Sequence, residues 1–145
     1  MKTLLCFIAL LFTVNVFSQT INYYVSPDGD DNNTGLTYED PFATIDHAFS
    51  LIPTDTNQVY GVNIYVLPGD YNQHIFVNKS GRFNYPIKIV AFSNQYKPVF
   101  YGDDNNIFSS YDAVFRFNAA RYFIEIEGLI LRNVTANDNM RGIWM

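Results

Sequence analysis

Short runs of β-branched and aromatic residues, separated by clusters of turn-forming residues, are the feature that most limits what this chain can fold into. Such residues favour strands, and several of the runs alternate apolar with polar positions. The Gly, Pro, Asn and Asp residues between them suit turns. The pattern predicts an all-β chain. The expected strands cover residues 21–25, 62–67, 74–77, 87–92, 99–101, 114–117, 122–126 and 129–131, and residues 142–145 are typical of the beginning of another.

One segment has helical spacing instead. Between Pro41 and Pro53, four apolar residues recur three or four positions apart, and the prolines suit the two ends of a helix. They are Phe42, Ile45, Phe49 and Ile52. We expect a helix over residues 42–52. A lone helix before a series of strands either packs on a sheet face or closes the open end of a strand stack, where unpaired backbone groups and apolar interior need cover.

The amino terminus has the pattern of a secretory signal peptide. Lys2 supplies the positive charge, residues 4–12 form the apolar region, and a more polar exit follows. We therefore expect residues 1–19 to be a signal peptide and residues 20–145 to be the mature domain, which would be secreted, either extracellular or at the cell surface.

A competing interpretation makes residues 3–18 an uncleaved anchor helix, but Asn15 and Ser18 interrupt a run already short for a bilayer span. Cys6 lies in this segment, so the mature part can form neither a disulfide nor a Cys-ligated zinc site. The net charge of −5 argues against nucleic acid as a partner, because phosphate binding needs clustered Lys and Arg. No later run is long enough for a membrane span.

Several stretches together resemble a known architecture. They are Tyr23–Gly35, Asp40–Ile45, Tyr65–Tyr71 with its Gly-x-Tyr turn, Gly81–Ala91, Lys97–Gly102 and Tyr122–Asn133. These stretches resemble the opening and the repeated coils of secreted right-handed parallel β-helix proteins, the pectate lyase-like and chondroitinase B-like superfamily. The resemblance implies an all-β solenoid, a right-handed parallel β-helix, whose start is covered by one amino-terminal capping helix.

The resemblance also implies a function. Relatives place calcium-binding carboxylates and a Lys or Arg base on a later parallel sheet, so we expect residues 20–145 to be the amino-terminal portion of a truncated β-helix domain without its catalytic coils. We therefore assign no catalytic residue. The implied activity is that of a polysaccharide lyase, or a glycoside hydrolase, acting on an acidic polysaccharide. The alternatives are a non-catalytic, extracellular glycan-binding or adhesin-like protein, and a fragment without activity of its own.

Oxygen-bearing residues after the first expected strand have the spacing of a calcium-binding loop. The expected calcium ligands are Asp28, Asp30, Asn32 and Glu39. Thr34 also stands at a ligand position of this spacing. Asn33 replaces the glycine that such a loop normally has, and two long helices are missing from its flanks. A solvated turn therefore explains these residues as well.

Other charged and aromatic residues leave two interpretations open. Four arginines near the expected strands either line a groove for an acidic polysaccharide, which a guanidinium binds in bidentate fashion, or lie on solvated strand faces. They are Arg116, Arg121, Arg132 and Arg141. The many aromatic rings either stack on sugars or fill the interior of a strand stack, and we favour the interior. The adjacent Asp30 and Asp31 alternate in direction, which argues against an acid/base pair.

Overall fold

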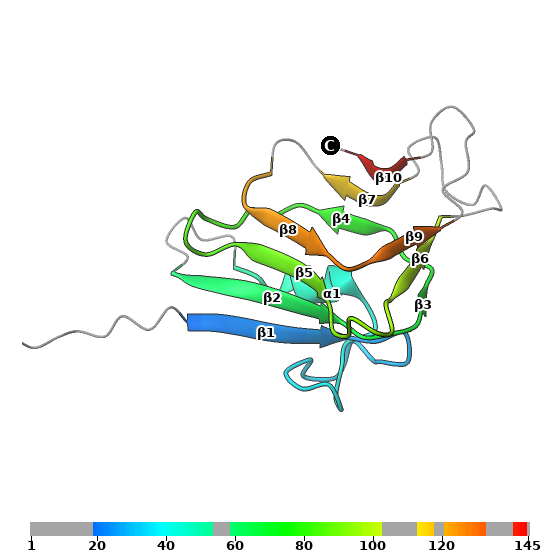
Figure 1. Ribbon diagram of the computed structural model, residues 1–145. Coiled ribbons are helices and arrows are strands. Elements are labelled where there is room, and N and C mark those ends of the chain that lie inside the picture. Colours follow the sequence, from blue (N-terminus) through cyan, green and yellow to red (C-terminus); the bar gives the residue numbers. More distant parts are fainter. Residues whose placement is uncertain (1–18, 54–58, 103–112, 118–120, 133–140, 145) are drawn as a thin grey trace, which may run out of the picture.

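A computed structural model describes residues 19–53, 59–102, 113–117, 121–132 and 141–144 (Figure 1). The signal peptide expected over residues 1–19 lies outside these ranges except for Gln19. The described strands are β1 (Gln19–Val25), β2 (Tyr60–Val66), β3 (Asp70–Tyr71), β4 (Ile75–Val77), β5 (Ile87–Ala91), β6 (Val99–Tyr101), β7 (Ala113–Phe117), β8 (Ile124–Glu127), β9 (Ile130–Arg132) and β10 (Arg141–Trp144). The helix α1 spans Ile45–Ser50.

In the described residues these strands form three sheets, and every pairing within the sheets is parallel. Sheet A has the order β1-β2-β5-β8, sheet B the order β3-β6-β9 and sheet C the order β10-β7-β4. The chain visits sheets A, B and C in turn, first as β2-β3-β4, then as β5-β6-β7 and then as β8-β9-β10 (Figure 1). The all-β class expected from the sequence is confirmed.

The observed strands lie close to the expected ranges, with one omission. β3 occupies Asp70–Tyr71, a segment that the sequence placed in a turn cluster. Two residues are too few for an alternating pattern to show, so only pairing with β6 identifies this strand. The strand expected to begin near residue 142 is confirmed as β10.

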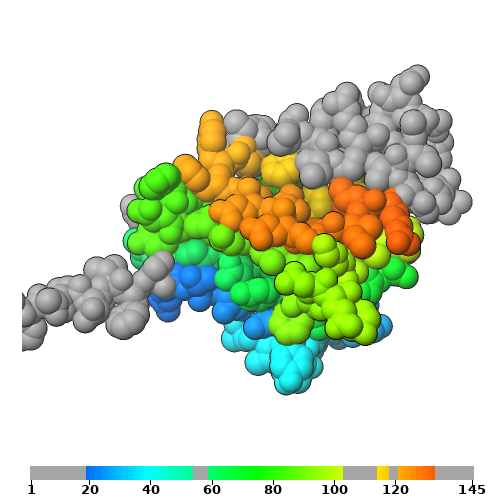
Figure 2. Space-filling view, viewed as in Figure 1, coloured from blue at the N-terminus to red at the C-terminus, as the bar shows by residue number. Residues whose placement is uncertain are grey.

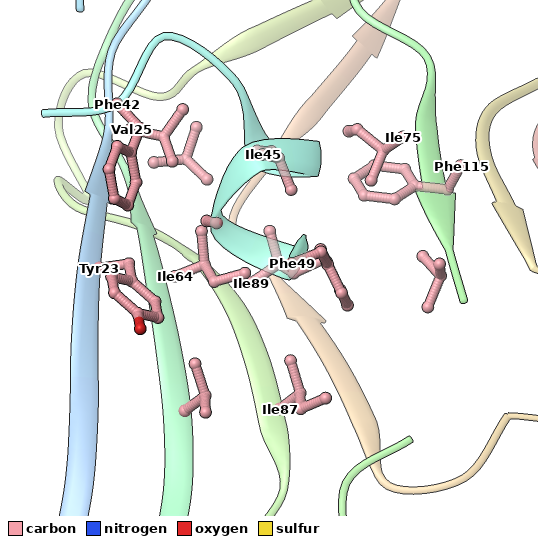
Figure 3. Packing of buried hydrophobic residues seen from close by; sticks show 14 of the residues in the cluster. Tyr23, Val25, Phe42, Ile45, Phe49, Ile64, Ile75, Ile87, Ile89 and Phe115 are labelled. Carbon is pink, nitrogen blue, oxygen red and sulfur yellow. The ribbon is translucent and has the colours of Figure 1, made fainter. Parts of the chain in front are cut away.

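The interior is built from rows of apolar residues that pair between neighbouring strands, mostly aliphatic in sheet A (Figure 3). In sheet A, Ile64 lies beside Ile89 in the parallel register, and both side chains are fully buried. Ile124 occupies the next position along the row of Ile87, but it is only half-buried. Its alternation with polar residues predicts that Ile124 points inward and is fully buried. Full burial is wrong, because no described strand covers the far side of β8.

Glycine makes the corner from sheet A to sheet B. Gly69 follows β2 and Gly128 follows β8, with φ angles of 144° and 76° that L side chains rarely adopt. A Cβ on Gly128 would also lie 2.9 Å from the Cβ of Ala91. Directly after the first corner, Tyr71 stacks on Phe100 with ring centroids 4.6 Å apart. The Gly-x-Tyr motif therefore turns the chain and then fills the interior with a ring.

The helix is shorter than expected, because it begins after Thr44 instead of at Phe42. Thr44 has extended backbone, and its Oγ1 accepts a hydrogen bond from the His47 backbone N–H, which satisfies one of the free donors of the first turn. Phe42 instead forms a parallel bridge with Val25 of β1. Ile45 and Phe49 of α1 point into the space between the sheets (Figure 3).

The helix covers the free edge of sheet C. β4 is the edge strand of that sheet, and the backbone N–H of Phe76 in β4 donates to Oδ1 of Asp46 at 2.9 Å. Lys79 follows β4, and its Nζ donates to the carbonyl of Ser50 at 2.9 Å and also to that of Ile52. Burial lowers the pKa of Lys79. The expected capping role is thus supported at this edge, where helix side chains take the place of a preceding strand.

We predict that Ile89→Ala lowers the free energy of unfolding by about 2–5 kcal/mol, because it leaves a cavity in a fully buried row. Val90→Ala is the matched control on the same strand, since the half-buried Val90 points outward, and it should cost less than about 1 kcal/mol. Chemical denaturation of both variants measures the difference. Equal losses would mean that the inward and outward faces of β5 are assigned wrongly.

Candidate functional site

Asp31 ties the loop after β1 to the start of α1. Its Oδ1 accepts hydrogen bonds from the backbone N–H groups of Ala43 and Thr44, both at 2.9 Å, and its Oδ2 accepts from Oγ1 of Thr44 at 2.9 Å. Thr44 is also the residue that caps the helix. The carboxylate of Asp31 therefore has a structural role that the sequence did not reveal.

The expected calcium donors of this loop bond to one another or to neighbours. Oδ1 of Asp30 accepts from the backbone N and the Nδ2 of Asn32, both at 2.8 Å. Oδ2 of Asp40 accepts from the backbone N and Oγ1 of Thr34 at 3.0 and 2.7 Å, which lowers the pKa of Asp40. The bond from Asn32 to Asp30 is that of an Asx turn, in which the side chain bonds the backbone two residues on, whereas Asp40 accepts from Thr34 six residues earlier and closes the loop.

The other two expected ligands are exposed. The backbone N–H of Asp28 donates to Oγ of Ser26 at 3.2 Å, and a hydrogen bond from Tyr38 lowers the pKa of Glu39. Within the described ranges, no group of three or more His, Cys, Asp or Glu side chains is placed to hold a metal ion. Calcium binding stays a prediction for the proposed ligands Asp28, Asp30, Asn32 and Glu39.

The outer face of sheet A carries two rows of side chains. The parallel register forms one row from Asn22, Asn63, Lys88 and Glu125, and the other from Tyr24, Tyr65, Val90 and Glu127. In the first row, Nδ2 of Asn63 donates to Oδ1 of Asn22 at 3.0 Å, and Nζ of Lys88 lies 2.5 Å from Oε2 of Glu125. The hydrogen bond to Glu125 raises the pKa of Lys88.

Two rings of the second row and two rings from neighbouring segments pack together, and we call them the sheet-A aromatic cluster: Tyr24, Tyr65, Tyr38 and Phe92. Tyr24 stacks on Tyr65 at 5.4 Å between ring centroids, and the edge of Phe92 packs against both. Tyr38 stacks on Phe92 at 6.1 Å. Figure 2 views this side of the molecule, with the loop that carries Tyr38 in cyan and the segment after β5 in lime.

Tyr38 and Phe92 remain 55% and 46% exposed. Sequence reasoning assigned most aromatic residues to the interior and missed this cluster. The sequence did contain a signal for it. Tyr38 lies between the expected strand 21–25 and the expected helix 42–52, and Phe92 is the last residue of the expected strand 87–92. Neither position requires the ring to lie in the interior.

The four arginines do not share one face. Arg116 lies on β7 in sheet C, Arg132 on β9 in sheet B, Arg141 on β10 in sheet C, and Arg121 in the segment before β8. The register of sheet C places Arg116 between Phe76 and Trp144. The guanidinium of Arg116 lies 5.7 Å from the centre of the Phe76 ring, a cation–π contact on the outer face.

Comparison with solved structures supports a polysaccharide lyase-like, carbohydrate-active fold. The chain superposes on a rhamnogalacturonan lyase with a TM-score of 0.61 and 26% sequence identity. The match covers 76% of this chain but only 28% of that lyase. No protein-family model matches the sequence, and no curated protein matches it either.

The described part of the chain contains no helix that is long and apolar enough to cross a membrane.

We predict that Asp31→Ala lowers the free energy of unfolding by about 1–3 kcal/mol, because it removes the acceptor for three donors at the helix start. Asp30→Ala is the control, since its donors come from Asn32 and are exposed, and it should cost less than about 0.5 kcal/mol. Thermal or chemical unfolding of the two variants decides this. Similar losses for both would contradict the structural role of Asp31.

A calcium site in the loop predicts a different result. With an affinity typical of extracellular modules, calcium at about 10 mM would add roughly 1.4–2.7 kcal/mol of stability by mass action. Asp30→Asn should remove most of this increment, because it removes one charged oxygen donor. Melting temperatures of both forms, with calcium and with chelator, test the site. Equal temperatures for the native chain would leave the loop as a hydrogen-bonded turn.

Proposed function

We propose that the chain is the amino-terminal part of a secreted, polysaccharide lyase-like protein that binds an acidic polysaccharide and that has a right-handed parallel β-helix. The observation that carries the proposal is the repeated passage through sheets A, B and C, together with the likeness to a rhamnogalacturonan lyase. The connection between two parallel strands of one sheet is right-handed in about 98% of cases, which supports a right-handed β-helix.

The small share of the lyase that this chain matches supports the view that binding and catalysis lie in different parts of the protein. The matched part of this chain corresponds to 28% of the rhamnogalacturonan lyase. We infer that the present coils supply a covered start of the solenoid and a glycan-binding surface, whereas catalysis belongs to coils that the present sequence does not include. The catalytic coils of such a protein would supply the base and the groups that neutralise the uronate carboxylate.

Sheet C offers the surface best suited to an acidic polysaccharide. The exposed Arg116 lies over the Phe76 ring, so a flat apolar side chain and a planar cation stand next to each other. A guanidinium binds a carboxylate through two parallel hydrogen bonds, and it keeps its charge at any physiological pH. A uronate could place its ring against Phe76 and its carboxylate at Arg116.

A second candidate is a non-catalytic, extracellular glycan-binding or adhesin-like protein. The exposed aromatic cluster on sheet A favours it, because such rings suit binding and bring no acid or base. Either function would require export. We propose that residues 1–19 are removed during secretion, and amino-terminal sequencing of the exported protein should find Thr20 first. Recovery of intact Met1 in a membrane fraction would contradict this.

We predict that the 145-residue chain is retarded in gels that contain pectate but releases no unsaturated product from pectate, alginate or chondroitin. Arg116→Gln should weaken the retardation about two- to fivefold, because exposed ion pairs contribute up to about 1 kcal/mol. Lys97→Gln is the control, since it removes an equal charge from an exposed loop between sheets A and B, and it should leave the retardation unchanged.

Two results would contradict these proposals. A rise in ultraviolet absorbance with calcium present would show that the chain is catalytic by itself. Unretarded migration of the native chain in all three polysaccharides would refute an acidic polysaccharide as the partner.

A further inference from the structure

We propose that the sheet-A aromatic cluster is a binding surface for a neutral oligosaccharide, separate from the Arg116 surface on sheet C. The inference rests on the proposed function only in that the ligand is a glycan. It adds a second site and a second class of sugar.

Strand stacking explains only half of the cluster. Tyr24 and Tyr65 are partners in the parallel register, so their contact follows from the pairing of β1 with β2. Tyr38 comes from the loop before α1, and Phe92 comes directly after β5. These two rings stack on each other at the surface and stay about half-exposed. The two exposed rings therefore continue the partly buried stack of Tyr24 and Tyr65. Together the rings form a contiguous apolar patch, and exposed patches of this kind mark binding sites.

The shape and polarity of the patch fit a sugar. A sugar ring has apolar C–H faces, which pack on aromatic rings, and a rim of hydroxyl groups that need hydrogen-bond partners. Tyrosine supplies both kinds of surface, because its ring is apolar and its hydroxyl donates and accepts. Next to the rings, the amide of Asn63 contacts both Asn22 and the Tyr65 hydroxyl, at 3.0 and 3.5 Å. The Tyr65 hydroxyl and the Asn63 amide therefore supply polar groups beside the cluster for the hydroxyl groups of a sugar.

The charges around the cluster select against acidic sugars. Lys88 is bonded to Glu125, so its charge is already matched. Glu127 ends the row that contains Tyr24 and Tyr65, and Glu39 is hydrogen-bonded to Tyr38. The cluster is therefore bordered by more negative than positive charge. A uronate carboxylate brought here would meet like charges, whereas a neutral sugar would not.

The experiment is a calorimetric titration of the full chain with a panel of neutral hexasaccharides, from β-1,4-galactan, xylan and arabinan, and with hexagalacturonate. At least one neutral hexasaccharide should bind. Its affinity should fall by about tenfold, equivalent to ~1.4 kcal/mol, in Tyr38→Ala and in Phe92→Ala. Tyr38→Phe should keep most of the affinity, since the stacking ring remains. Unchanged melting temperatures would show that the variants are folded.

Two controls separate this site from others. Phe83→Ala removes an 81% exposed ring that precedes β5, at the opposite end of the strand from Phe92, and it should leave the affinity unchanged. Arg116→Gln should leave neutral binding unchanged while it weakens pectate binding. The inference is overturned if no neutral hexasaccharide binds, if Phe83→Ala costs as much as Phe92→Ala, or if hexagalacturonate is the ligand that Phe92→Ala weakens. None of these outcomes depends on whether pectate binds at Arg116.

Discussion

The parallel register of sheet A is the constraint on which the rest of the described structure depends. Alternate residues point to opposite faces of a strand, so one register assigns every side chain to the interior or to the surface. Ile64 lies beside Ile89, and both are fully buried. A shift of one residue in β5 would turn Ile89 outward and bring Lys88 into the interior, where an unpaired ammonium is costly. The same register that packs the interior therefore also builds the outer rows.

A stack of parallel strands leaves unpaired edge strands in each sheet. In this chain a helix covers one of these edges, strand β4 of sheet C. Asp46 of α1 accepts a hydrogen bond from the backbone N–H of Phe76 on the edge strand of sheet C, and Lys79 donates to the carbonyl of Ser50, the last residue of the helix. Asp31 holds the helix start in place through Thr44. The loop between β1 and α1 is therefore more than a connection. It fixes the helix that covers the edge, and it carries Tyr38 to the surface of sheet A.

Two outer faces with different chemistry follow from this arrangement. Sheet C presents Arg116 over Phe76, whereas sheet A presents an aromatic cluster bordered by Glu127 and by Glu39. A polymer that contains both acidic and neutral sugars could meet both faces, each through the residues suited to it. The proposed functions differ in whether a further part of the protein adds catalysis, but both use the described sheets as a binding surface.

The sequence by itself determined the all-β class, most strand positions, the glycine corner and the existence of one helix. These depend on local patterns: alternation, turn residues, and prolines at helix ends. It did not determine β3, which exists only through pairing with β6, or the half-buried state of Ile124, which depends on what lies beyond β8. It also suggested a common role for four arginines that the sheets then separate. The partnership of Tyr38 with Phe92 was decided only in three dimensions, because the two residues are far apart in the sequence and meet where a loop folds back onto the end of a strand.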